Sequence, residues 1–220
     1  MNEASERLAA VRAGIARAAA VSGREAGDVT LIAVSKMHPA ASIEPMIAAG
    51  HRDFGESRVQ EAQAKWPELR ERHPEVRLHF IGRLQSNKAE EAVAMFDVLH
   101  SVDRPSLVDA LAAAAGKSAR RPDCFLQVNI GDEPQKGGCL PAELPALLDR
   151  ARAASLAVVG LMCIPPDAVE PAPYFALLAK LARRHGVDGL SMGMSGDYET
   201  AVAIGATHVR VGTALFGGRG

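Results

Sequence analysis

The fold follows from one stretch of the sequence, Val29-Thr30-Leu31-Ile32-Ala33-Val34-Ser35-Lys36, a short β-branched run that ends on a lysine. Such a run predicts a buried strand that leads into a loop and then a helix. Side chains alternate along a strand, so Ile32, Val34 and Lys36 share one face. If that face points into a closed barrel, burial lowers the pKa of the Lys36 amine and lets its nitrogen attack an aldehyde. A lysine that simply extends into solvent is the alternative.

Short strands and longer helices alternate along the rest of the chain. The predicted strands are Thr30–Ser35, Arg52–Gly55, Leu78–Ile81, Val98–Val102, Phe125–Ile130, Val158–Cys163, Gly189–Met192 and His208–Val211. The predicted helices are Ala40–Ala49, Ser57–Arg72, Asn87–Met95, Pro105–Ala115, Pro141–Ala154, Pro171–His185 and Asp197–Ile204. This alternation implies a parallel sheet, and eight strands predict an α/β fold, a closed (β/α)8 TIM-type barrel. An open sheet of six or seven strands is the alternative, because the second and seventh strands are weak.

An extra helix precedes the barrel. Leu8, Val11, Ile15 and Ala19 recur at helical spacing and predict an amphipathic surface helix rather than a signal peptide. The 220 residues fit one barrel domain, 1–220.

Charge and cysteine usage exclude several classes of function. The formal net charge is −1 and no basic stripe occurs, which argues against nucleic acid as a partner. No stretch predicts a membrane segment. The three cysteines lack CxxC and zinc-ligand spacing. We therefore expect no metal site and a cytoplasmic, reducing environment.

Two segments near the C-terminus have features of an anion site. In the first, a strand ends and a helix begins around Ser195, which can cap that helix. In the second, Gly212 allows close backbone approach and Thr213 offers an N–H and a hydroxyl. Each feature alone is also explained by a helix cap or a tight turn. At the ends of adjacent strands they predict a phosphate site, as is usual in barrels.

An arginine lies on the last predicted strand. Arg210 shares a strand face with His208 and Gly212. An inward arginine in a small barrel needs an acceptor, and a phosphate or an aromatic ring nitrogen would satisfy it.

A lysine that forms imines, with a phosphate site on the opposite side of the same mouth, describes pyridoxal 5′-phosphate. The phosphorylated sugar of a Schiff-base aldolase would be held by similar groups. A lysine after the first strand, with phosphate loops after the seventh and eighth, is similar to the alanine-racemase type of pyridoxal-phosphate barrel.

Motifs along nearly the whole chain point to a narrower group. They are Ala33-Val34-Ser35-Lys36, Phe54-Gly55-Glu56, His79-Phe80-Ile81-Gly82 followed by Leu84-Gln85-Ser86-Asn87-Lys88, Gln127-Val128-Asn129, Gly160-Leu161-Met162, Ser191-Met192-Gly193-Met194-Ser195 with Asp197, and the run from Gly205 to Gly217. With these motifs the chain resembles the small pyridoxal phosphate homeostasis proteins, also called proline synthase co-transcribed homologues.

The resemblance implies a barrel of the alanine-racemase N-terminal-domain type that binds pyridoxal 5′-phosphate as an internal aldimine on Lys36. It also implies a role in buffering or delivering the cofactor inside the cell, without established catalysis. We predict a monomer, with apo pyridoxal-phosphate-dependent enzymes as recipients. The predicted cofactor-binding residues are Lys36, Ser57, His79, Ser195, Arg210, Gly212 and Thr213. His79 faces inward if Ile81 does, although a strand histidine is commonly a hydrogen-bonded core residue.

The sequence departs from the family in two places. The family usually has asparagine where Ser57 stands, and the shorter serine side chain reaches less far toward the cofactor ring. The family also continues into a tyrosine-bearing tail, whereas this sequence ends at Gly220.

Three other functions remain as alternatives. A pyridoxal-phosphate-dependent amino-acid racemase or decarboxylase would add a β-rich domain and a second base, for which Tyr174 and Tyr198 are poorly placed on predicted helices. A Schiff-base aldolase would be colourless when purified. The third alternative is a partner-binding adaptor whose cofactor is only structural.

Overall fold

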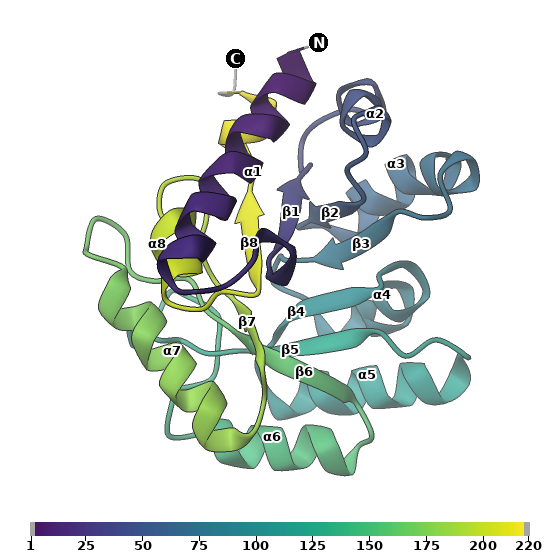
Figure 1. Cartoon of the computed structure of the whole chain (residues 1–220). Helices are drawn as coiled ribbons and strands as arrows, with labels where there is room; N and C mark the ends of the chain where they lie inside the picture. Colours follow the sequence, from purple (N-terminus) through teal and green to yellow (C-terminus); the bar gives the residue numbers. More distant parts are fainter. Residues whose placement is uncertain (1–2, 218–220) are drawn as a thin grey trace.

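Eight parallel strands close into a barrel in the computed structural model, which describes residues 3–217 (Figure 1). The strands are β1 Thr30–Val34, β2 Asp53–Glu56, β3 Arg77–Phe80, β4 Val98–Val102, β5 Asp123–Gln127, β6 Ala157–Met162, β7 Gly189–Ser191 and β8 His208–Val211. The barrel closes where β1 pairs with β8, in a register that sets Ile32 beside Arg210. The closed barrel is therefore correct and the open sheet is not. The two weak strands form as β2 and β7.

Helices on the outside of the barrel connect the strands. They are α1 Glu3–Val21, α2 Ala40–Ala48, α3 Val59–Arg72, α4 Ala89–Met95, α5 Pro105–Lys117, α6 Leu144–Ala153, α7 Ala172–His185, α8 Tyr198–Ala203 and α9 Thr213–Phe216, with 3-10 turns at Ala26–Asp28 and Ser86–Lys88. Most match the predicted helices to within three residues. The short helix α9 was not predicted, because four residues carry no measurable periodicity.

The core has two layers. Leu31 and Ala33 of β1 belong to the large apolar layer between the strands and the helices. Inside the barrel, Val98, Phe125 and Met162 form a separate small cluster. This alternation follows from strand geometry, which sends successive side chains to opposite faces. Ile32 is fully buried, does not belong to the outer layer and pairs in register with Arg210, so it faces the interior. Lys36 follows β1, at the carboxyl end of the strand, where the mouth of the barrel lies.

The predicted N-terminal helix forms as α1. Its buried residues include the four expected positions, Leu8, Val11, Ile15 and Ala19. The helix packs against α8, α9 and α2, so that the two ends of the described chain lie side by side (Figure 1). No helix within residues 3–217 is both long and apolar enough to cross a membrane.

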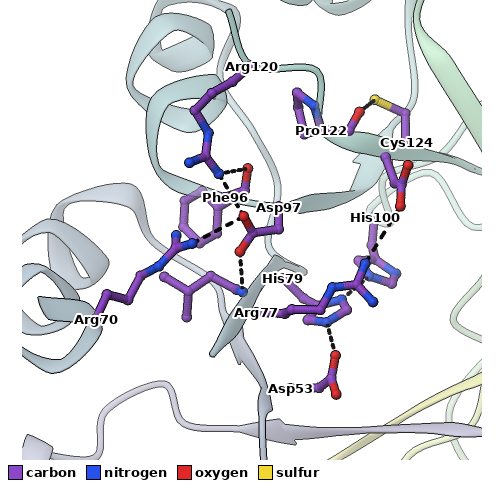
Figure 2. Close-up of polar contacts among 12 residues, drawn as sticks. Asp53, Arg70, Arg77, His79, Phe96, Asp97, His100, Arg120, Pro122 and Cys124 are labelled. Carbon is purple, nitrogen blue, oxygen red and sulfur yellow. Dashed lines mark hydrogen bonds and ion pairs between the residues drawn. The ribbon is translucent and has the colours of Figure 1, made fainter. Parts of the chain in front are cut away.

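The amino ends of the strands are joined by an ionic cluster around Asp97. Its carboxylate accepts hydrogen bonds from Arg70 of α3 at 3.2 Å, from Arg120 at 2.7 Å and from the Leu78 amide at 2.8 Å (Figure 2). Because these partners come from separate elements, the cluster ties α3, β3 and the start of β5 together at the end of the barrel opposite the mouth.

Candidate functional site

A tight turn carries Lys36 at the carboxyl end of β1. The His38 amide donates to the Ser35 carbonyl at 3.1 Å, which closes the turn. Met37 has φ of 65°, the left-handed region that non-glycine residues seldom adopt. Lys36 is half-buried. Within residues 3–217 its amine has no hydrogen-bond or ion-pair partner, so the nitrogen is free to react.

Polar side chains of α3 hold this turn, and the sequence analysis missed them. The Lys65 ammonium donates to the carbonyl oxygens of Ser35 and His38, each at 2.9 Å. Glu61, one helical turn earlier, accepts from the Met37 amide. The i, i+4 spacing of Glu61 and Lys65 was the available signal, but it indicates only an ion pair on a helix face.

The loops after β7 and β8 meet through one hydrogen bond. The Gly212 amide donates to the Ser195 hydroxyl at 3.3 Å, which brings the two predicted segments together. The amides of Ser195, Gly196, Thr213 and Ala214 donate to no acceptor in the part of the chain that the structure describes. A concave group of free amides at two loop ends is a typical anion site.

Ser195 does not cap a helix, contrary to the prediction. Helix α8 begins at Tyr198, after a turn in which the Met194 amide donates to the Asp197 carboxylate at 2.5 Å and the Tyr198 amide donates to the Met194 carbonyl at 2.8 Å. The Asp197 carboxylate thus accepts the hydrogen bond that closes the turn before the helix. The Ser195 hydroxyl therefore stays available and bonds to the β8 loop instead.

The expected position of the anion site relative to Lys36 also needs correction. The two were predicted on opposite sides of the mouth, but β8 is the strand next to β1. A Cβ on Gly212 would lie 3.4 Å from Cβ of Val34, so the loop passes directly beside the end of β1. Barrel closure, which joins the first strand to the last, makes Lys36 and the free amides neighbours.

Arg210 points into the barrel below the mouth, as predicted, and it is 4 % exposed. Its guanidinium donates to the Ser191 hydroxyl at 2.7 Å and to the Cys163 carbonyl at 2.8 Å. Burial lowers the pKa of the guanidinium from its usual 12.5. Among the described residues no carboxylate contacts it, so neutral groups satisfy this buried cation.

A chain of hydrogen bonds runs from Arg210 to the far end of the barrel. Ser191 contacts His100 Nδ1 at 2.8 Å, His100 Nε2 contacts His79 Nδ1 at 3.0 Å, and His79 Nε2 contacts Asp53 Oδ1 at 3.0 Å. Figure 2 shows its lower half, from His100 to Asp53. With both rings neutral, one set of tautomers gives every link a donor, each proton pointing from the arginine toward the carboxylate. The cation at the top is thereby connected to an anion at the bottom.

Two predicted residues lie apart from the amide group. His79 faces inward with Ile81, as expected, but both of its ring nitrogens are engaged in the interior and its side chain is fully buried. Ser57 lies at the end of β2, beside the end of β1, and lines a cavity of about 730 Å³ between the loops after β2, β3 and β4. A Cβ on Gly82 would lie 2.1 Å from the Ser57 carbonyl oxygen, which fixes this loop closely against the next.

Both tyrosines of the chain lie outside the barrel. Tyr198 begins α8, and a Cβ on Gly14 of α1 would lie 2.3 Å from its hydroxyl. Burial raises the pKa of Tyr198. Tyr174 belongs to α7 and packs against the outer apolar layer.

Similarity to known proteins, in sequence and in structure, extends along nearly the whole chain. The family described as alanine racemase, N-terminal domain, matches residues 7–220. A protein of Pseudomonas aeruginosa named pyridoxal phosphate homeostasis protein is 42% identical over 225 residues, which cover 100% of this chain and 97% of that protein. A protein of the same name from Escherichia coli K12 is 39% identical over 229 residues, covering 100% of this chain and 98% of that protein.

Solved structures agree with this result. PipY of Synechococcus elongatus, solved with PLP bound, has a TM-score of 0.85 at 42% identity and covers 98% of this chain and 100% of its own. Alanine racemase of Clostridium difficile has a TM-score of 0.70 at 13% identity, covering 87% of this chain and 53% of its own, and shares the fold alone. This chain belongs to the family of the alanine racemase N-terminal domain and, within it, to the group of proteins named pyridoxal phosphate homeostasis proteins.

Proposed function

We propose that this protein binds pyridoxal 5′-phosphate at the barrel mouth and serves in cofactor homeostasis by holding and releasing it. One observation carries the proposal: Lys36, whose amine has no partner in the described chain, follows the strand that pairs with β8, and the joined loops after β7 and β8 carry backbone amides that are also without partners there. An aldehyde that also bears a phosphate satisfies both groups at once. The name of the relatives and the cofactor bound to PipY support the same function.

The groups at the mouth fit this cofactor. The amides of Ser195, Gly196, Thr213 and Ala214, with the Thr213 hydroxyl, provide donors for phosphate oxygens. Gly212 leaves room for close approach, since a Cβ there would already touch Val34. When bound, the cofactor supplies an aldehyde that is reactive toward amines and an electron-withdrawing ring. Lys36 holds it covalently, the two loops orient its phosphate, and Arg210 supplies positive charge from below.

Ser57 and His79 enter the proposal in different ways. Ser57, beside the end of β1, is proposed to contact the ring side of the cofactor in place of the family asparagine. His79 is proposed to act indirectly, because it is linked to Arg210 through His100 and Ser191.

The decisive experiment targets Lys36. Borohydride reduction of the protein with bound cofactor should attach a pyridoxyl group to Lys36, as read by peptide mass mapping. Lys36→Ala should abolish the visible absorbance band, while Lys180→Ala, on the outer helix α7, should keep it. A label on another lysine, or an unchanged band in Lys36→Ala, would overturn the assignment.

We further propose that the protein does not turn over amino acids. Racemisation needs a proton acceptor on one face of the α-carbon and a proton donor on the opposite face, and Lys36 serves one face only. The location of both tyrosines outside the barrel supports this proposal. Solvent deuterium should enter the α-carbon of alanine slowly or not at all. Exchange at roughly 1–10³ s⁻¹, as in ordinary enzymes, would restore the racemase.

Partners and compartment follow from the same function. Apo pyridoxal-phosphate-dependent enzymes are the proposed recipients, and the proposed acting unit is a monomeric single domain, which light scattering can test. The cytoplasm is the proposed compartment, because Cys124, Cys139 and Cys163 are free thiols, as is usual in reducing surroundings.

A further inference from the structure

The turn that carries Lys36 needs external support. Met37 lies in the left-handed region, at a position of the turn that glycine usually occupies. For a residue with a Cβ this conformation is strained, because the Cβ comes too close to the following carbonyl oxygen. The turn also directs the carbonyls of Ser35 and His38 and the amide of Met37 toward α3, away from the barrel ladder.

Lys65 provides that support from α3. Its side chain is 8 % exposed, and its ammonium lies 2.9 Å from each of the two carbonyl oxygens and 2.7 Å from the Glu56 carboxylate. An ammonium has three N–H donors, and they are used by the two carbonyl oxygens and by the Glu61 carboxylate, which accepts at 3.2 Å. The Glu56 carboxylate is the buried ion-pair partner of the ammonium.

Glu56 fixes Lys65 from below. Its side chain is fully buried, and the atom Oε1 also accepts from the Ser35 hydroxyl at 2.7 Å and from Trp66 Nε1 at 3.0 Å. Ser35 is therefore held through its hydroxyl and through its carbonyl. A buried lysine with this many fixed acceptors has no freedom to swing into the mouth, which leaves the reactive role to Lys36.

We propose that Lys65 is the positioning residue of the Lys36 site. Its ammonium binds the carbonyls on both sides of the turn and so fixes the point at which the Lys36 side chain leaves the backbone. Glu61 assists by holding the Met37 amide. This role rests on the proposed function of Lys36, and it predicts that the reactivity of Lys36 depends on a residue that does not touch the cofactor.

If Lys65 only stabilised the fold, its removal would affect unfolding and not the turn that carries Lys36. Helix α3 offers a matched control for this distinction. Arg70 lies on the same helix and also binds a main-chain carbonyl, that of Met95 at 2.7 Å. Figure 2 shows its second contact, with the Asp97 carboxylate. Its contacts are at the opposite end of the barrel. Lys65→Met and Arg70→Met both remove a cation from α3, but only Lys65→Met releases the turn.

The experiment measures the purified full-length protein, freed of cofactor, in three ways. Thermal unfolding gives the stability of each variant. Hydrogen exchange by NMR gives the protection of the Met37 and His38 amides without any cofactor. Stopped-flow absorbance gives the rate at which added pyridoxal 5′-phosphate, and pyridoxal without phosphate, bond to Lys36.

Because Lys65→Met removes the charge-assisted hydrogen bonds to both carbonyls of the turn, it should slow bonding of both aldehydes by a factor on the order of ten or more. Exchange at the turn should speed up by a similar factor. Arg70→Met should lower the melting temperature and change neither quantity. Wild-type protection and wild-type rates in Lys65→Met would overturn the proposal, as would equal effects in Arg70→Met.

A second variant covers the case in which Lys65→Met does not fold, since it leaves Glu56 buried without its cation. Glu61→Ala keeps that pair and removes the contacts of Glu61 with the Met37 amide and with the Lys65 ammonium. It should expose this amide to exchange and slow bonding, whereas unchanged values would contradict the proposal. Failure of the wild-type protein to bond any aldehyde would refute the proposed function instead, and the exchange measurement would still test Lys65.

Discussion

The proposed phosphate contacts at the mouth come mostly from main-chain amides, and Thr213 is the residue among them whose side chain can be removed without loss of other contacts. Its hydroxyl has no partner among the described residues, and the side chain is exposed. Thr213→Ala should therefore leave the fold intact and weaken binding of pyridoxal 5′-phosphate about tenfold, the value of one charge-assisted hydrogen bond. Fluorescence or absorbance titration measures the affinity.

Pyridoxal without its phosphate completes this test. It should bind far more weakly than the phosphate ester to the wild-type protein, and Thr213→Ala should hardly change its affinity. Ser42→Ala, on α2, is a control that should alter neither ligand. Equal affinity of the wild-type protein for both aldehydes would exclude a phosphate site in these loops.

At the scale of elements, the loops after β2 and β3 lie in direct contact at Gly82. A Cβ on Gly82 would lie 2.1 Å from the Ser57 carbonyl oxygen, too close for backbone atoms that cannot rotate away. Gly82→Ala should therefore force the loops apart and lower the free energy of unfolding by about 1–3 kcal/mol. It should also weaken cofactor binding, because the Ser57 loop begins beside the end of β1.

Gly116 in α5 is the matched control. Nothing lies within 4 Å of a Cβ placed there. Gly116→Ala should therefore raise the free energy of unfolding by roughly 0.5–1 kcal/mol, because alanine loses less entropy in a helix. Urea denaturation of both variants gives the comparison. A Gly82→Ala protein as stable as the wild type would contradict the close loop packing.

Elements with a clear period were predictable from the sequence, and contacts between distant elements were not. The β-branched run before Lys36 and the apolar spacing of α1 identify their buried faces, because a side chain's place in the period determines its direction. Lys65 was missed because it lies some thirty residues from the carbonyls it binds. Ser195 was misassigned as a cap because serine also favours turns, and here Asp197 supplies the acceptor for the turn.

At the scale of the whole molecule, the barrel encloses several histidines that fold in the neutral form. Burial lowers the pKa of His208, inside the barrel, to about 4, and that of His51, beside the start of β2, to about 4. Burial lowers the pKa of His100 well below its usual 6.5. Of these three, His100 belongs to the hydrogen-bond chain below Arg210, so proton uptake by its ring would break that chain.

The sign of the pH effect follows from these shifts. Between about pH 6.5 and pH 4, each of these histidines is protonated in the unfolded chain and neutral in the folded protein, so unfolding takes up protons. Their stabilising effect is complete above about pH 7 and is lost as the pH falls toward 4. Asp53 acts in the same direction at lower pH, because its hydrogen bond to His79 accompanies a pKa below 3.8.

We therefore expect the free energy of unfolding to fall by about 2 kcal/mol per buried histidine between pH 7.5 and pH 5, a large part of the stability of an ordinary domain. His208→Met should remove one proton from this uptake and flatten the pH dependence by that amount. Val209→Ala, at the next position of β8, is the control. It opens a small cavity in the outer layer and should lower the free energy of unfolding by the same amount at every pH. Urea denaturation at pH 7.5, 6 and 5 measures all three proteins. If His208→Met keeps the wild-type slope, the His208 ring is not neutral in the folded barrel, and the acid sensitivity of the protein has another origin.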